Sequence, residues 1–163
     1  MTTVVPVIEG WFTIDEPPAL LGRHCTQCGT YQFPPTAEWC PNPACTNESL
    51  DTVPLSRTGT VWSYTDARYQ PPAPYVSPTD PYQPFAIAAV ELEREGIVVL
   101  GQVADGFGIS DLRIGTPVEV VVEALDPPLI DQAGEESTKL VWRWRPIQPE
   151  GKADPTGGKD SGR

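Results

Sequence analysis

Four cysteines are the residues of this sequence best suited to chemistry. Cys25 and Cys28 are separated by two residues, and Cys40 and Cys45 are separated by four. Eleven residues lie between the two pairs. Cysteines spaced in this way can direct their sulfurs toward one point, and two such pairs complete a tetrahedral site of four thiolates. The spacing therefore predicts a metal centre formed by Cys25, Cys28, Cys40 and Cys45.

Zinc is the metal that this ligand set favours, because the sequence shows no sign of a redox partner. A rubredoxin-like iron site uses the same four ligands and stays open as an alternative. Gly29 follows Cys28 directly and can adopt a positive φ, which lets backbone amides approach the thiolates. Four thiolates leave no position for water or substrate, so we expect a structural zinc ion. His24, the one histidine, is surplus to this ligand set.

No other group of residues has the pattern of a catalytic site. The sequence lacks a nucleophile elbow, a phosphate-binding loop and a dinucleotide fingerprint. Its carboxylates are numerous, but Glu91, Glu93 and Glu95 follow the alternation of a strand and its turn, which is typical of a solvated rim. We therefore expect no catalytic residue in this chain.

Two features of the sequence could contact a partner. One is the proline-rich segment 70–84, because tyrosines among prolines offer contacts of low entropic cost. The other is the Trp-Arg-Trp-Arg run at 142–145, whose arginines could hold an acidic partner or a phosphate. The simpler alternatives are a loop that covers the end of a barrel and a solvated strand face. The candidate interface residues are Tyr69, Tyr75, Tyr82, Phe85, Arg143 and Arg145.

The composition favours short strands and stiff connections around these sites. The chain has 163 residues, of which 20 are proline and 14 are glycine. Proline breaks helix interiors, which disfavours a helical bundle. Five segments alternate or are rich in β-formers, and the segment 105–115 between the third and fourth is expected to be a loop or short helix. The five are Thr58–Tyr69, Phe85–Glu93, Ile97–Ala104, Pro117–Ala124 and Thr138–Ile147.

This order of elements is typical of an OB-type barrel, although an SH3-like barrel or a small sandwich shares the periodicity. The expected fold is mainly β, with a small four-cysteine zinc ribbon followed by a five-stranded OB-type barrel. We expect an arm at 1–22 with a short helix capped by Asp15 and begun by Pro17 and Pro18. The ribbon then spans 23–54, the barrel spans 55–147, and a disordered tail spans 148–163.

The charge and hydropathy of the chain indicate its surroundings. Eleven basic residues against 22 acidic ones give a net charge of −11, which is unfavourable for binding a nucleic-acid backbone. No apolar run is long enough to span a membrane, and the first residues do not have the pattern of a signal peptide. We therefore expect a cytoplasmic protein, in which the cysteines stay reduced.

Several motifs, taken in order, resemble the zinc-ribbon and OB-fold proteins associated with acyl-CoA thiolases and aldolases. They are the knuckle at 25–29, the Phe-Pro-Pro at 33–35, the second cysteine pair, TGTVWSYT at 58–65 and PFAIAAVEL at 84–92. The resemblance runs from about residue 20 to residue 147. It implies a rubredoxin-type ribbon joined to an OB barrel.

The resemblance also implies a function. Proteins of this kind are non-catalytic accessory subunits that form hetero-oligomers with thiolase-fold enzymes, either thiolases or retro-aldolases of acyl-CoA, including steroid side-chain CoA thioesters. It implies contact between this chain and the CoA thioester of its partner. Two other functions stay open: a single-stranded nucleic-acid-binding module that stacks bases on Trp62, Tyr64 and Tyr69, and a small iron–thiolate redox protein.

Overall fold

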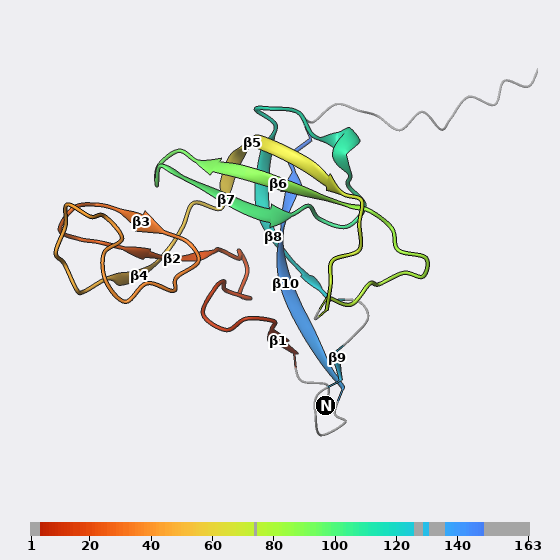
Figure 1. Ribbon diagram of the computed structural model, residues 1–163, viewed down its shortest axis with the longest axis horizontal. Helices are drawn as coiled ribbons and strands as arrows, with labels where there is room; N and C mark the ends of the chain where they lie inside the picture. The colour runs from red at the N-terminus through yellow and green to blue at the C-terminus, as the bar shows by residue number, and fades with distance from the viewer. Residues whose placement is uncertain (1–3, 74, 126–128, 131–135, 149–163) are drawn as a thin grey trace, which may run out of the picture.

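The computed structural model describes residues 4–73, 75–125, 129–130 and 136–148, and these form two β-sheets (Figure 1). The smaller sheet has three antiparallel strands in the order β3-β2-β4. Its strands are β2 (Leu21–His24), β3 (Tyr31–Gln32) and β4 (Asp51–Pro54). This sheet lies to one side of the larger sheet in Figure 1 and carries the loops that hold the cysteines.

The larger sheet has the strand order β1-β10-β8-β5-β6-β7, and β9 pairs with β10. A parallel bridge between Val103 and Trp144 joins the chain beyond β7 to β10, so that the sheet curls into a barrel. All five predicted barrel strands are present, and a single 3-10 turn, η1 (Ile109–Asp111), occupies the expected insertion. The strands are β1 (Val4–Pro6), β5 (Thr58–Ala67), β6 (Phe85–Leu92), β7 (Ile97–Gln102), β8 (Pro117–Ala124), β9 (Leu129–Ile130) and β10 (Glu136–Pro146).

The core of the barrel follows the period of two in its strands. Along β6 every second side chain is buried, namely Ala86, Ala88, Val90 and Leu92, as the alternation of the sequence predicts. Trp144 of β10 is wholly buried among them, whereas Arg145 beside it is exposed. The mainly β class is therefore confirmed, with a barrel core formed by alternate side chains of strands such as β6 and β8.

A row of aromatic rings connects the small sheet to the barrel. Phe33 follows β3 and meets Trp11 of the arm and Trp142 of β10 edge-on, each at 5.8 Å between ring centroids. Trp142 in turn contacts Trp144 of the barrel core at 5.6 Å. Edge-to-face contacts of this kind stabilise beyond the apolar area that they bury. The row therefore fixes the ribbon against the barrel.

The arm differs from its prediction, because the described residues 4–22 contain no helix. Val4 to Pro6 form β1, which runs parallel to β10. Residues 12 and 20 form a β-bridge, and the Thr13 hydroxyl accepts a hydrogen bond from the Ala19 N–H at 3.0 Å. A residue that precedes proline is pushed toward extended backbone, so the Pro17-Pro18 pair keeps residues 16 and 17 out of the α conformation.

The predicted disordered tail lies outside the described residues apart from Gln148. Within the described part of the chain, no helix is long and apolar enough to cross a membrane.

Candidate metal centre and adjoining cleft

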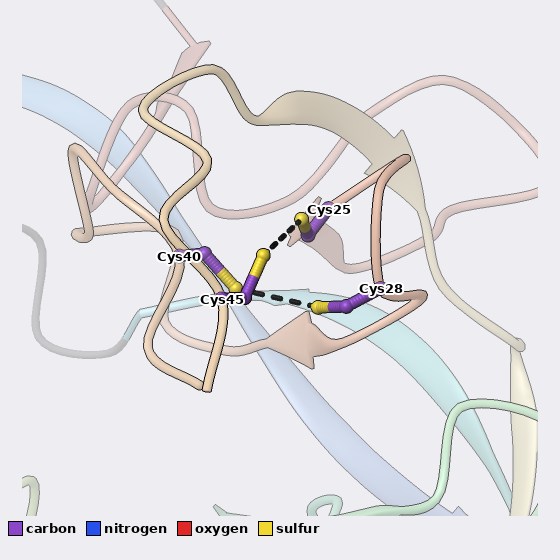
Figure 2. A group of neighbouring side chains, drawn as sticks. All are labelled: Cys25, Cys28, Cys40 and Cys45. Carbon is purple, nitrogen blue, oxygen red and sulfur yellow. Dashed lines mark hydrogen bonds between the residues drawn. The ribbon is translucent and has the colours of Figure 1, made fainter. Parts of the chain in front are cut away.

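The four cysteines come together at one end of the small sheet. Cys25 and Cys28 lie in the turn between β2 and β3, and Cys40 and Cys45 lie in the long loop between β3 and β4. Figure 2 shows their sulfurs pointing toward a common point. Gly29 has the predicted positive φ, at +77°. Its N–H donates to the Cys25 carbonyl at 2.8 Å, which closes the first turn.

The distances between the sulfurs fit a tetrahedral ion. A zinc ion bound to four thiolates at about 2.3 Å separates neighbouring sulfurs by about 3.8 Å. Here the Sγ atoms of Cys25 and Cys45 are 3.8 Å apart, those of Cys28 and Cys40 are 3.5 Å apart, and all four lie within 4.8 Å of one another. These separations are too long for disulfides, and all four cysteines are free. The donor set therefore fits one structural zinc ion.

Two polar side chains support the sulfurs. The Asn47 amide donates to Cys25 Sγ at 3.2 Å and to the Ser49 carbonyl at 2.7 Å, so its orientation is fixed. The hydrogen bond from Asn47 lowers the pKa of Cys25. Thr30 Oγ1 lies 3.1 Å from Cys28 Sγ, and this contact lowers the pKa of Cys28 to about 6. Both contacts therefore make the thiolate forms of Cys25 and Cys28 less costly than in a free cysteine.

The pKa values of Cys40 and Cys45 are raised, in contrast to those of Cys25 and Cys28. Burial raises the pKa of the Cys40 thiol to about 12. The Asn47 backbone lowers the pKa of Cys45, but burial and the neighbouring Cys28 and Cys25 thiols outweigh it, and the pKa is raised. A divalent cation reverses this preference, because its charge stabilises every thiolate that coordinates it. Sites of this kind release protons as the metal binds.

His24 lies outside the cluster, as expected from the surplus of ligands. Its ring stacks on Tyr31 at 4.3 Å, across the pair of strands that begins the ribbon. Within the described residues, the group that could hold a metal contains the four cysteines and no histidine.

The aromatic candidates for an interface fall into two groups. Tyr75, Tyr82 and Phe85 form a cluster, with ring centroids 5.9 Å apart for Tyr75 and Phe85 and 6.5 Å apart for Tyr82 and Phe85. The Tyr82 hydroxyl donates to the Ala67 carbonyl, which ties the proline-rich segment to the end of β5. Tyr69 does not join this cluster and is 90% exposed.

Both candidate arginines form ion pairs with acidic residues of the same chain. Arg143 Nη1 pairs with Asp105 and, at 3.2 Å, with Glu123. Arg145 Nη2 pairs with Glu119 at 2.7 Å, across the register of β8 and β10. Their positive charges are therefore neutralised locally, which the sequence pattern did not indicate.

A cleft of about 780 Å³ lies between the arm, the proline-rich segment, the turn after β7 and β10. Tyr75 and Phe85 of the aromatic cluster line it, together with Trp11 and Trp142 of the aromatic row and Arg143. Tyr69, Tyr82 and Arg145 are not among its lining residues. The sequence did not reveal this cleft, because its walls come from four segments that only the barrel closure brings together.

Comparison with known protein families gives two adjoining matches. Residues 16–51 match the rubredoxin-like zinc ribbon domain of ChsH2, and residues 52–123 match its C-terminal OB-fold domain.

Relatives of known description share this region. A DUF35 domain-containing scaffold protein of Methanocaldococcus jannaschii is 35% identical over 118 residues, which cover 71% of this chain and 75% of that protein. A probable enoyl-CoA hydratase alpha subunit of Thermomonospora curvata is 32% identical over 73% of this chain. The benzoylsuccinyl-CoA thiolase subunit BbsA of Thauera aromatica is 41% identical over 30% of this chain. The matches span only 34% and 32% of these last two proteins.

A solved structure, described as the Ltp2-ChsH2(DUF35) aldolase, has a similar fold. Its matching chain aligns with a TM-score of 0.53 and 28% sequence identity. The alignment covers 78% of this chain and 84% of that chain.

Proposed function

This chain belongs to the family of ChsH2-type proteins, in which a rubredoxin-like zinc ribbon precedes an OB-fold domain, and we propose on that premise that it is a non-catalytic accessory subunit of a thiolase-fold enzyme. The enzyme would be a thiolase or retro-aldolase that acts on acyl-CoA, with steroid side-chain CoA thioesters as one substrate class. Relatives described as a scaffold protein, as enzyme subunits and as part of an aldolase complex support this proposal.

The observation that carries the proposal is the lining of the cleft. Its only charged lining residues within the described part of the chain are Asp105 and Arg143, and these two pair with each other. Asp105 is engaged by Arg143, and Tyr75 stacks on Phe85 in the aromatic cluster. A large cleft with mainly apolar walls is suited to holding part of a ligand.

The metal site has a structural role in this proposal. Cys25, Cys28, Cys40 and Cys45 would hold a zinc ion that cross-links the β2–β3 turn to the loop before β4. This cross-link would orient Phe33 and, through Trp142, one wall of the cleft.

The cleft also gives a place for the acyl group of the partner's substrate. Tyr75, Phe85 and Trp142 provide flat apolar walls, and the paired Arg143 adds a polar end. Such a surface would contact the acyl portion of a CoA thioester when the enzyme completes the other side.

The two alternative functions have less support. A nucleic-acid-binding module needs free cations, but Arg143 and Arg145 are paired with carboxylates and the chain has a net charge of −11. An iron–thiolate redox protein would show a red iron–thiolate absorption when freshly purified, whereas zinc gives a colourless protein with one equivalent of metal.

Co-purification tests the proposal directly. The chain is co-expressed with the thiolase-fold enzyme encoded beside it, and the enzyme is also produced alone. We expect one hetero-oligomer, together with lower solubility or activity of the enzyme alone. A chain that stays monomeric beside an enzyme equally active and soluble without it would contradict the proposal.

A further inference from the structure

The outer face of β5, β6 and β7 carries almost no charge. The strand register aligns three rows of side chains on this face, each with one residue from each strand. The middle row contains Ser63, Ala89 and Leu100, and it lies between a row that contains Ile87 and a row that contains Glu91. Glu91 is the one charged member of the three rows, although the chain as a whole is rich in charge.

Trp62 stands on this face because of an irregularity in β5. The pairing of β5 with β6 shifts register between Val61 and Ser63, so Trp62 is an additional residue opposite β6. A β-bulge of this kind redirects a side chain. Val61 is buried, whereas Trp62 is 61% exposed at the edge of the middle row.

Leu100 is the member of the same row that lies on β7, and it is 67% exposed. Between Trp62 and Leu100 lie only the small side chains of Ser63 and Ala89, so the face has two raised apolar ends and a low centre. Val98 on β7 is exposed as well. An exposed apolar sheet face next to an edge strand favours association with another chain.

Charge decides what kind of chain fits this face. Glu91 lies within the rows, and Glu93 is exposed in the turn that follows β6. Two copies of this chain would bring these carboxylates and two net charges of −11 together, which opposes self-association. A partner with an apolar centre and lysines or arginines around it would match both the apolar rows and the acidic rim.

We infer that the outer face of β5–β7, centred on Trp62 and Leu100, is the docking surface for the thiolase-fold partner, which presents an apolar patch with a basic rim. This inference rests on the proposed function and adds to it the place of contact. Tryptophan in the centre of an interface is commonly a residue on which affinity depends strongly.

The experiment measures the affinity of the enzyme encoded beside this chain for three purified variants. The double variant Trp62→Ser/Leu100→Ser should raise Kd at least tenfold, and Glu91→Lys should slow association and reduce its salt dependence. The control is Trp39→Ser, because Trp39 is similarly exposed, at 64%, but lies on the ribbon. It should change Kd less than threefold. All variants should keep the wild-type metal content and melting temperature, since the altered side chains are exposed.

The outcomes separate this inference from the proposed function. A double variant that binds the enzyme like wild type, or a Trp39→Ser variant that loses as much affinity, overturns the docking face while the accessory role stands. If the wild-type chain forms a dimer by itself and the double variant is a monomer, the assignment of the enzyme as the partner at this face is overturned. If wild type does not bind the enzyme at all, the proposed function and this inference both fail.

Discussion

The Glu95 carboxylate accepts hydrogen bonds from both the backbone N–H and the hydroxyl of Ser56, at 2.7 and 3.0 Å. Glu95 lies in the β6–β7 turn of the barrel, and Ser56 lies in the link between β4 of the ribbon and β5. Arg94 completes the arrangement with an ion pair to the same oxygen at 2.7 Å. This contact therefore anchors the link between the two sheets to the barrel, and Glu95 is buried instead of lying on a solvated rim.

Glu95→Gln should destabilise the fold by about 1–3 kcal/mol, because hydrogen bonds to a buried charged acceptor are lost or weakened. Urea denaturation of both proteins measures the difference. Glu93→Gln is the matched control, since Glu93 is exposed in the same turn, and it should change stability by less than about 0.5 kcal/mol. Equal stability of Glu95→Gln and wild type would contradict the anchoring role.

The contact between Glu95 and Ser56 also predicts how stability depends on pH. Burial alone would raise the pKa of Glu95, but the hydrogen bonds from Ser56 and Arg94 outweigh it, so the pKa is lowered. Its stabilising effect is therefore present above the unfolded pKa, about 4.3, and is lost as the pH falls through the folded pKa. The difference in unfolding free energy between wild type and Glu95→Gln should shrink on acidification. If this difference in unfolding free energy instead grows on acidification, the proposed stabilisation by ionised Glu95 is contradicted.

Asn47→Ala should weaken zinc binding by about 10- to 100-fold, because the amide that orients Cys25 Sγ is removed while all four ligands remain. Competition with a coloured chelator measures the affinity. Glu48→Gln, an exposed neighbour, serves as the control and should bind zinc like wild type. Unchanged affinity of Asn47→Ala would show that the hydrogen bond does not support the site.

Gly101→Ala should destabilise the barrel by about 1–3 kcal/mol. A Cβ at this position would lie 2.4 Å from two ring atoms of Trp142, and that ring is held between Phe33 and Trp144. Gly108→Ala is the control, since a Cβ there would meet nothing within 4 Å. Thermal unfolding of both variants distinguishes them, and equal melting temperatures would be inconsistent with this packing.

Cys28→Ser should release the metal and unfold residues 23–50, because three thiolates hold the ion weakly. Metal analysis and hydrogen exchange should show both changes, while the turnover number of any enzyme that remains assembled should not change. His24→Gln should retain a full equivalent of metal. If metal content and partner binding both survive in Cys28→Ser, the structural-zinc interpretation is wrong.

Patterns with a short period were sufficient to predict the strands and the clustering of the four cysteines. The alternation from Phe85 to Leu92 gave the buried face of β6, and the spacing of the cysteines gave the cluster. Both depend on local geometry, which the sequence encodes within a few residues. The ribbon and barrel classes, which the resemblance implied, are confirmed by the matched family domains.

Features that depend on long-range closure could not be predicted. Glu95 appeared to continue the alternation of exposed acids, but its partner Ser56 is 39 residues away in sequence. The bulge at Trp62 depends on the register with β6, and the cleft depends on the bridge between Val103 and Trp144. The expected helix in the arm was wrong because backbone contacts between residues 11–13 and 19–21 outweigh the local capping signal.

The most direct test of the accessory role is a titration of this chain into a fixed amount of its thiolase-fold partner, with CoA thioester turnover as the readout. We expect no turnover by the chain alone and an enzyme rate that rises with added chain and saturates at a fixed ratio. Turnover by the chain alone, or an enzyme rate that its addition does not change, would contradict the accessory role.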